Sequence, residues 1–111
     1  MNASDSAPEA PLHVVMSTAP SRESAERIAT ALVEEGLTAC VQLVPGVTSI
    51  YRWQGELTRG EELLILAKTT RPQACLERLA ALHPYEVPEG LAIAATAVLP
   101  SYLRWAQESA T

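Results

Sequence analysis

The sequence predicts a single α+β domain in which four strands and two helices follow the order β-α-β-β-α-β, with a short helix added at the C-terminus. Short segments rich in Val, Ile and Leu alternate with two segments whose apolar residues recur at helical spacing. Pro and Gly residues separate these segments. The 111 residues, 48% of them hydrophobic, provide one small core and leave no room for a second domain.

The first strand and the first helix are predicted from residues 12–36. Residues 12–18 are apolar and partly β-branched, and the turn after them contains Pro20. Ser21 is the expected N-cap of the helix, and Gly36 is its expected end. Between them, apolar residues fall at i, i+3, i+4, i+7 and i+8, which indicates one apolar stripe: Ala25, Ile28, Ala29, Leu32 and Val33.

The middle of the chain predicts a hairpin. Residues 37–44 alternate between more and less apolar positions, and strand-like composition resumes at 47–53 after Pro45-Gly46. We therefore expect either one strand bent at Pro-Gly or two strands in succession. Residues 54–60 are the expected hairpin tip. Residues 63–67 are apolar at every position, which is typical of a strand that is buried on both faces.

The second helix is expected to begin with a capping box of Thr70 and Gln73, to carry Pro72 in its first turn, and to end at His83. A last strand is predicted over residues 91–99, and the terminal helix begins at Pro100. This order is the ferredoxin-like arrangement, with both main helices on one face of an antiparallel sheet. The apolar run 63–67 then leaves aliphatic side chains uncovered on the other face, so we expect a homo-oligomer built on that face.

Composition excludes several classes of partner. A net charge of −5 and a pI near 4.9 argue against nucleic acid, which requires clustered Lys and Arg. No apolar run is long enough to span a membrane. Two widely spaced cysteines without a CxxC pattern favour free thiols and a cytoplasmic location. Residues 1–11 are expected to form a disordered tail without signal-peptide features, followed by one domain over residues 12–108.

The most distinctive segment is residues 83–89, His-Pro-Tyr-Glu-Val-Pro-Glu, which combines an imidazole, a phenol and two carboxylates. Pro84 and Pro88 fix their own φ angles and restrict the residues before them. The segment is either a functional site or a stiff connector with solvated carboxylates. Acid/base catalysis by His83 with Glu86 or Glu89 is the least favoured function, because no nucleophile or cofactor motif accompanies them. We therefore do not expect an enzyme.

Several motifs together resemble one known family. They are Ser17-Thr18-Ala19-Pro20, Ala39-Cys40-Val41, Pro45-Gly46-Val47-Thr48-Ser49-Ile50-Tyr51, Leu66-Ala67-Lys68-Thr69, residues 83–89, and Tyr102-Leu103-Arg104-Trp105. In this order they resemble the CutA family of divalent-cation tolerance proteins. The resemblance implies a ferredoxin-like subunit, assembly into a homotrimer similar in shape to PII signalling proteins, and a role in tolerance of copper and other divalent metals.

The predicted metal ligands are His83 and Cys40, and the metal is copper or another divalent ion. Some members of the family carry Cys and His where this chain has Ser17 and Leu82, so two soft ligands are absent. We expect a cleft between subunits, with these residues as its walls: Lys68, Tyr85, Glu86, Glu89 and Trp53. The alternative function is a PII-like regulatory module that binds a small anion or nucleotide in this cleft, using Lys68, Arg71 and helix N-termini near Ser21 and Thr70.

Overall fold

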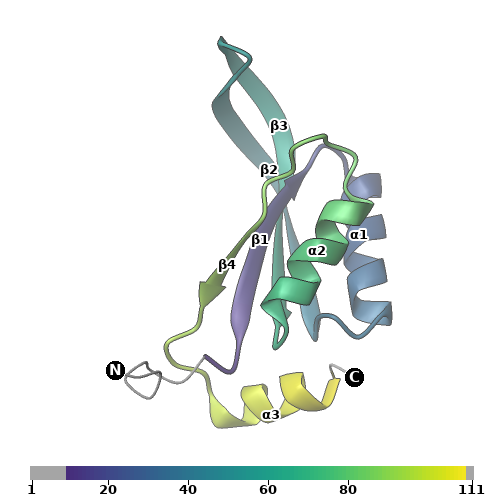
Figure 1. Cartoon of the computed structure of the whole chain (residues 1–111), viewed down its shortest axis with the longest axis vertical. Coiled ribbons are helices and arrows are strands. Elements are labelled where there is room, and N and C mark those ends of the chain that lie inside the picture. Colours follow the sequence, from purple (N-terminus) through teal and green to yellow (C-terminus); the bar gives the residue numbers. More distant parts are fainter. Residues whose placement is uncertain (1–9, 110–111) are drawn as a thin grey trace.

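The computed structural model describes residues 10–109 (Figure 1). Its elements are β1 (His13–Ala19), α1 (Arg22–Glu34), β2 (Cys40–Trp53), β3 (Glu56–Thr69), α2 (Pro72–Leu82), β4 (Leu91–Ala94) and α3 (Pro100–Ser109). The predicted tail lies outside the described residues for residues 1–9. Within the described range, no helix is both long enough and apolar enough to cross a membrane.

The four strands form one antiparallel sheet in the order β2-β3-β1-β4. Both α1 and α2 pack on one face of this sheet, and α3 lies across its end near the start of β1 (Figure 1). The predicted α+β class and the β-α-β-β-α-β order with a C-terminal helix are therefore confirmed.

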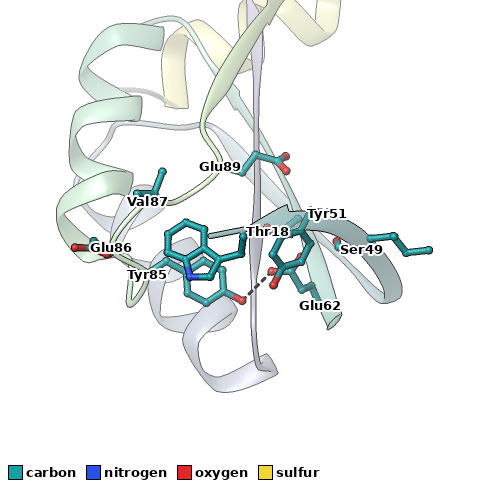
Figure 2. Close-up of a pocket in the computed structure, with 10 residues that line it drawn as sticks. Thr18, Ser49, Tyr51, Glu62, Tyr85, Glu86, Val87 and Glu89 are labelled. Carbon is teal, nitrogen blue, oxygen red and sulfur yellow. Dashed lines mark hydrogen bonds between the residues drawn. The ribbon is translucent and has the colours of Figure 1, made fainter. Parts of the chain in front are cut away.

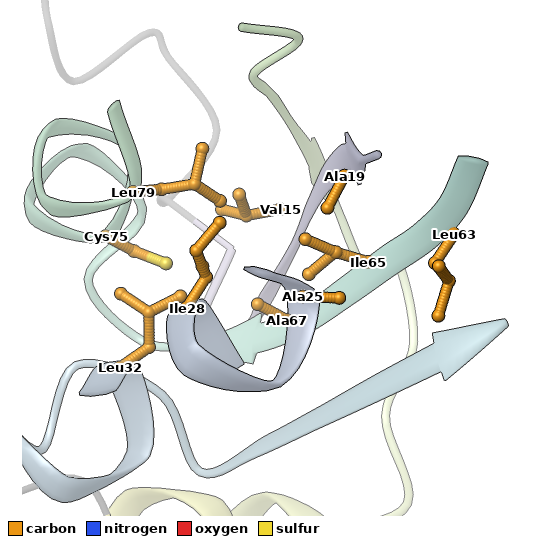
Figure 3. Packing of buried hydrophobic residues seen from close by; sticks show 10 residues of the cluster. All are labelled: Val15, Ala19, Ala25, Ile28, Leu32, Leu63, Ile65, Ala67, Cys75 and Leu79. Atoms are coloured by element: carbon orange, nitrogen blue, oxygen red, sulfur yellow. The ribbon is translucent and has the colours of Figure 1, made fainter. Parts of the chain in front are cut away.

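The core lies between the sheet and the two helices, where every second residue of β3 from Leu63 to Thr69 is buried (Figure 3). Ile65 and Ala67 of β3 are fully buried, as is Val15 of β1. Helices α1 and α2 close this layer with a set of fully buried side chains: Ala25, Ile28, Leu32, Cys75 and Leu79. The sulfur of Cys75 thus belongs to the core, and burial raises the pKa of its thiol to about 11.

The opposite face, here called the open face, is formed by the alternate residues of the same strands. Strand register places Leu66 level with Met16 and Leu91, and Val14 level with Ile93. Leu64 and Leu66 are only half-buried, and Leu91 and Ile93 are 43% and 49% exposed. The run at 63–67 is therefore apolar on both faces, but only one of them is covered by the helices of this chain.

Strands β2 and β3 continue past the helices as a two-stranded arm, residues 47–62 (Figure 1). The predicted tip at 54–60 is wrong, because only Gln54 and Gly55 form the turn and β3 begins at Glu56. Both turn residues have positive φ, 52° and 84°, as a two-residue type I′ hairpin requires. The polar composition of residues 56–62 hid this strand, since neither face of the arm meets the core.

The bend predicted at Pro45-Gly46 is a β-bulge within one continuous strand. Pairing of β2 with β3 shifts register between Val44 and Val47, and Gly46 has φ of 77°. A bulge bends and twists its strand locally. The arm therefore leaves the sheet at an angle that the bulge helps to set.

Three predicted element ends differ from the structure. Strand β2 begins at Cys40 rather than residue 37, because Leu37 N–H bonds the Leu32 carbonyl in a Schellman motif around Gly36. The predicted capping box is wrong, since Arg71 is the N-cap of α2 and makes no side-chain capping bond. Strand β4 ends at Ala94, because its partner β1 begins at His13. The Ser21 cap is confirmed: its hydroxyl accepts the Ser24 N–H at 3.1 Å.

Candidate functional site

His83 holds residues 83–89 against the end of β1. Its Nδ1 accepts the Tyr85 backbone N–H at 3.1 Å, and its Nε2 lies 2.6 Å from the Thr18 carbonyl oxygen. A nitrogen that accepts carries no proton, so in the neutral ring Nε2 carries it and donates to Thr18. The side chain is 9% exposed. Both ring nitrogens are thus used to fasten the segment to the sheet.

Tyr85 extends this attachment from the segment to the arm. Its hydroxyl donates to the Glu62 carboxylate at 2.8 Å, and its ring packs against the His83 ring at 4.8 Å between centroids. Glu62 belongs to β3, where the arm begins. The segment 83–89 therefore contacts both β1 and β3 and is positioned by side chains at each.

A cavity of about 520 Å³ opens at the base of the arm beside this segment (Figure 2). It is lined by residues from β1, β2, β3 and the segment: Thr18, Ser49, Ile50, Tyr51, Trp53, Glu62, Tyr85, Glu86, Val87 and Glu89. Its volume lies in the range of small-molecule sites, which is about 300–1,000 Å³. Four of the residues predicted for a cleft, namely Trp53, Tyr85, Glu86 and Glu89, thus come together within one chain.

The phenol of Tyr85 is expected to ionise only in strongly alkaline solution. Desolvation, and then the hydrogen bond and negative charge of Glu62, raise its pKa from 10.0 to about 12. The pKa of Tyr85 is higher in the folded than in the unfolded state. The protonated phenol therefore adds to the free energy of unfolding below about pH 10, and this contribution is lost as pH rises through 12. Tyrosinate absorbance can be followed as pH rises in the wild type and in Tyr85→Phe. The difference between the two titrations reports Tyr85 alone, and its midpoint should lie near pH 12. A midpoint near pH 10 would contradict this assignment.

Glu62→Gln separates the two causes. The variant removes the negative charge and leaves the burial of Tyr85 in place, so the midpoint should move down but stay above the ordinary tyrosine value. An unchanged midpoint would mean that Glu62 does not act on this phenol.

The two predicted metal ligands do not meet within one chain. His83 lies level with Thr18, and strand register places Thr18 level with Val44, four positions along β2 from Cys40. At about 3.3 Å per residue this separation is about 13 Å, whereas a shared ion needs both donors within about 2.0–2.3 Å of itself. Among residues 10–109, no group of three His, Cys, Asp or Glu side chains is arranged to hold a metal. Within residues 10–109 of one chain, the two predicted ligands are therefore not brought together.

Lys68 and Arg71 lie apart from the cavity. Lys68 donates to the Gln42 side chain on the open face, level with Cys40. Arg71 donates to the Gly36 carbonyl at 2.7 Å, joining the start of α2 to the end of α1. The described lining of the cavity contains no Lys, Arg or His, so its charge does not favour an anion. A place for Lys68 in a cleft between subunits stays a prediction.

Sequence reasoning gives Tyr51, with Trp53 and Tyr85, as a wall of an apolar cleft or as an interface residue, and among the charged lining residues it misses Glu62. Glu62 stands next to the apolar run 63–67 and is interpreted as its charged flank. Glu62 and Tyr51 lie beside residues 83–89 because the arm begins where that segment crosses the sheet. Only the pairing register, with Glu62 level with Val47 and Tyr51 level with Thr58, shows that both point to the open-face side of the arm.

Comparisons with known proteins agree with this architecture. Residues 13–109 match the family model described as CutA1 divalent ion tolerance protein. The divalent-cation tolerance protein CutA of Thermus thermophilus is 53% identical over 98 residues, covering 86% of this chain and 95% of that protein. The chloroplastic protein CutA of Arabidopsis thaliana is 36% identical over 107 residues, 95% of this chain and 59% of that protein. The crystal structure of CutA from Xylella fastidiosa is 41% identical, with a TM-score of 0.88 over 91% of this chain and 99% of that one.

The fold and the arm thus define a ferredoxin-like α+β protein with an extended β2-β3 hairpin, and sequence and structure point to the same class of relatives. The chain belongs to the CutA1 family of divalent ion tolerance proteins.

Proposed function

We propose that this protein acts in tolerance of copper or another divalent metal as a homotrimer, without enzymatic activity, in the cytoplasm. The open face carries the proposal. Exposed and half-buried apolar side chains gather on it, and α1 and α2 cover only the other face of the same sheet (Figure 1). The names of its relatives state divalent-cation tolerance, and the trimer is what the family resemblance implies.

The open face supports self-association energetically. Val44, Leu91 and Ile93 are between 41% and 49% exposed, and Leu64 and Leu66 lie half-buried between them. Full burial of one such side chain stabilises by about 1.5–3 kcal/mol, so several together favour a protein partner. A second copy is the simplest partner, because it carries the same surface.

The geometry of the single chain supports a metal site shared between copies. Cys40 lies at the start of β2, on the open face and near Tyr102, whose pKa it raises after the larger effect of burial. Assembly on that face would bring copies of the Cys40 thiol into one interface, where a thiolate suits Cu(I) or Zn(II). His83 is a weaker ligand candidate, because a metal would have to displace one of its two hydrogen bonds.

Light scattering on a matched pair of variants tests the assembly. Ile93→Asp places a charge on the open face, and Val33→Asp places the same charge on α1 at a similar exposure, 49% against 44%. The wild type and Val33→Asp should have the mass of a trimer at micromolar concentration, and Ile93→Asp should have a reduced mass. A monomeric wild type would refute the proposal.

Calorimetric titration with Cu(II) and Zn(II) tests the shared site. If copies share the site, the stoichiometry should be one ion for several chains, and Cys40→Ser should abolish binding while Cys75→Ser should not. One ion per chain, or binding retained in Cys40→Ser, would contradict a shared thiolate site. Absence of metal binding in the intact assembly would show that tolerance does not operate by sequestering the ion.

A further inference from the structure

The cavity at the base of the arm carries negative charge that its own lining does not neutralise. Glu62, Glu86 and Glu89 line it, and the seven other described lining residues are uncharged at neutral pH. Glu62 accepts the Tyr85 hydroxyl, whereas Glu86 and Glu89 have no hydrogen bond or ion pair among residues 10–109. Strand register places Glu62 and Thr18 on the open-face side of the sheet. The unbalanced charge therefore belongs to the surface on which copies of the chain are proposed to meet.

A single cation occupies the other end of the open face. Lys68 is the only lysine in the sequence. It is also the only Lys or Arg of the described strands on this face, because register turns Arg52 and Arg59 to the opposite side of the arm. Its amine donates to the neutral Gln42 side chain and has no ion pair among residues 10–109. The open face thus has a cation at one end and carboxylates at the other, and neither charge is balanced within the described chain.

These two ends of the open face cannot meet within one chain. Lys68 and Glu62 lie six positions apart on the same strand, β3, which is about 20 Å at 3.3 Å per residue. An ion pair needs its nitrogen and oxygen within about 4 Å, and a lysine side chain is too short to cover the difference. Burying an unpaired charge is costly. Assembly on this face therefore favours an arrangement in which the lysine of one copy meets the carboxylates of another.

The lining of the cavity suits a lysine side chain. The rings of Tyr51, Trp53 and Tyr85 are 45%, 43% and 37% exposed, and the volume is about 520 Å³. Aromatic faces attract cations, and the apolar stem of a lysine packs on apolar surface while its amine stays with polar groups. Figure 2 shows Tyr51 and Tyr85 beside the Glu62 carboxylate. The cavity therefore provides apolar walls for the stem and carboxylates for the amine.

The wall of the cavity formed by residues 83–89 is held in place within the single chain. His83 fastens the backbone of the segment through the Thr18 carbonyl and the Tyr85 N–H, and Glu62 accepts the Tyr85 hydroxyl. Two prolines restrict the backbone of the same segment. A preorganised surface loses less conformational entropy when its partner binds.

We propose that the cavity at the base of the arm receives the Lys68 side chain of a neighbouring copy, whose amine pairs with Glu89 beside the rings of Tyr51 and Tyr85. Glu89 is the chosen carboxylate because Glu62 is engaged with Tyr85, and Figure 2 shows Glu86 turned away from the rings. This contact rests on the proposed self-association and not on the proposed thiolate site. In a closed ring, each copy gives its lysine to one neighbour and receives a lysine from the other, so every cavity is filled.

Carbodiimide cross-linking tests the contact directly. The reagent adds to a carboxylate, and a neighbouring amine then displaces it as a urea and forms an amide bond, so groups in ion-pair contact are joined. Lys68 has the only side-chain amine in the chain, so covalent dimers and larger products on a denaturing gel should contain a Lys68–Glu89 link, identified by mass spectrometry. Lys68→Arg keeps the charge without a reactive amine. It should lose this product and keep the mass of the wild type in light scattering.

Glu89→Gln and Glu86→Gln are the matched pair for this experiment. The first should abolish the link between copies and the second should retain it. An assembled protein that gives no Lys68–Glu89 product, gives it within a single chain, or loses it in Glu86→Gln would overturn the contact and leave the proposed self-association intact. A monomeric wild type without cross-linked products would overturn both.

Charge reversal tests the energy of the contact. Lys68→Glu places a carboxylate against those of the cavity and should raise the dissociation constant of the assembly at least about tenfold. Sedimentation measures this constant at a guanidinium concentration that partly dissociates the wild type. Adding Glu89→Lys to the same chain should recover most of the loss, and adding Glu86→Lys should recover much less, although both double variants have the same net charge. Equal recovery by the two, or no loss in Lys68→Glu, would overturn the pairing of Lys68 with Glu89.

Discussion

Ile65→Ala is expected to lower the free energy of unfolding by about 2–5 kcal/mol, the range for truncating a large buried aliphatic side chain. Ile65 is fully buried in the central strand β3 and points into the layer beneath the helices (Figure 3). The Ile65→Ala variant loses buried apolar area. It also loses packing contacts, because neighbours from the sheet and α1 cannot collapse fully into the space that the side chain leaves.

Urea unfolding followed by circular dichroism measures this loss, with Val33→Ala as the control. Val33 is 44% exposed on the outer side of α1, so its truncation should change stability by about 0.5 kcal/mol or less. The measurement should be repeated over a range of protein concentrations, because self-association adds to the apparent stability. Equal effects of the two substitutions would contradict the burial of Ile65.

The order of elements could be predicted because each carries a local signal. The apolar stripe of α1 between Ser21 and Gly36 has a helical period, and both ends have residues suited to their caps. The uncovered face could be predicted as well, because Leu64 and Leu66 alternate with Leu63, Ile65 and Ala67 in a strand that two helices cover on one side only.

The arm and the completed cavity could not be predicted in this way. Residues 56–62 are mostly polar, so periodicity gives no strand signal, and their pairing depends on the two-residue turn at Gln54-Gly55. The meeting of Tyr85 with Glu62 depends on where the arm leaves the sheet, which the bulge at residues 44–47 influences. Such contacts join segments distant in sequence, and no local pattern specifies them.

The two hydrogen bonds of His83 also escaped prediction, although the residue itself stood out. Its place at the end of α2 suggested a ligand, an acid/base or a helix cap. The structure shows a fourth role: the ring links the Thr18 carbonyl to the Tyr85 N–H across 65 and 2 positions of sequence. A side chain that satisfies two backbone groups can be distinctive in sequence for structural reasons alone.

His83→Ala is therefore expected to destabilise the protein by about 2–4 kcal/mol, through two lost hydrogen bonds and a vacated buried site. The matched control is His13→Ala, which removes the other histidine; the buried Nδ1 of His13 has no hydrogen-bond partner among the described residues. That variant should lose less, about 1 kcal/mol. Urea unfolding gives the magnitude, and hydrogen exchange gives the location: the Tyr85 amide should lose protection in His83→Ala and keep it in His13→Ala.

The same variant separates a structural from a metal-binding role for His83. If the ring acts only as a fastening, the copper stoichiometry measured well below the unfolding midpoint should match that of the wild type, while the Tyr85 amide loses its protection from exchange. A variant that keeps its stability and the protection of the Tyr85 amide but loses copper would contradict the fastening role. It would assign the imidazole to the metal, since a ligand exposed for binding does not need to hold the segment in the free protein.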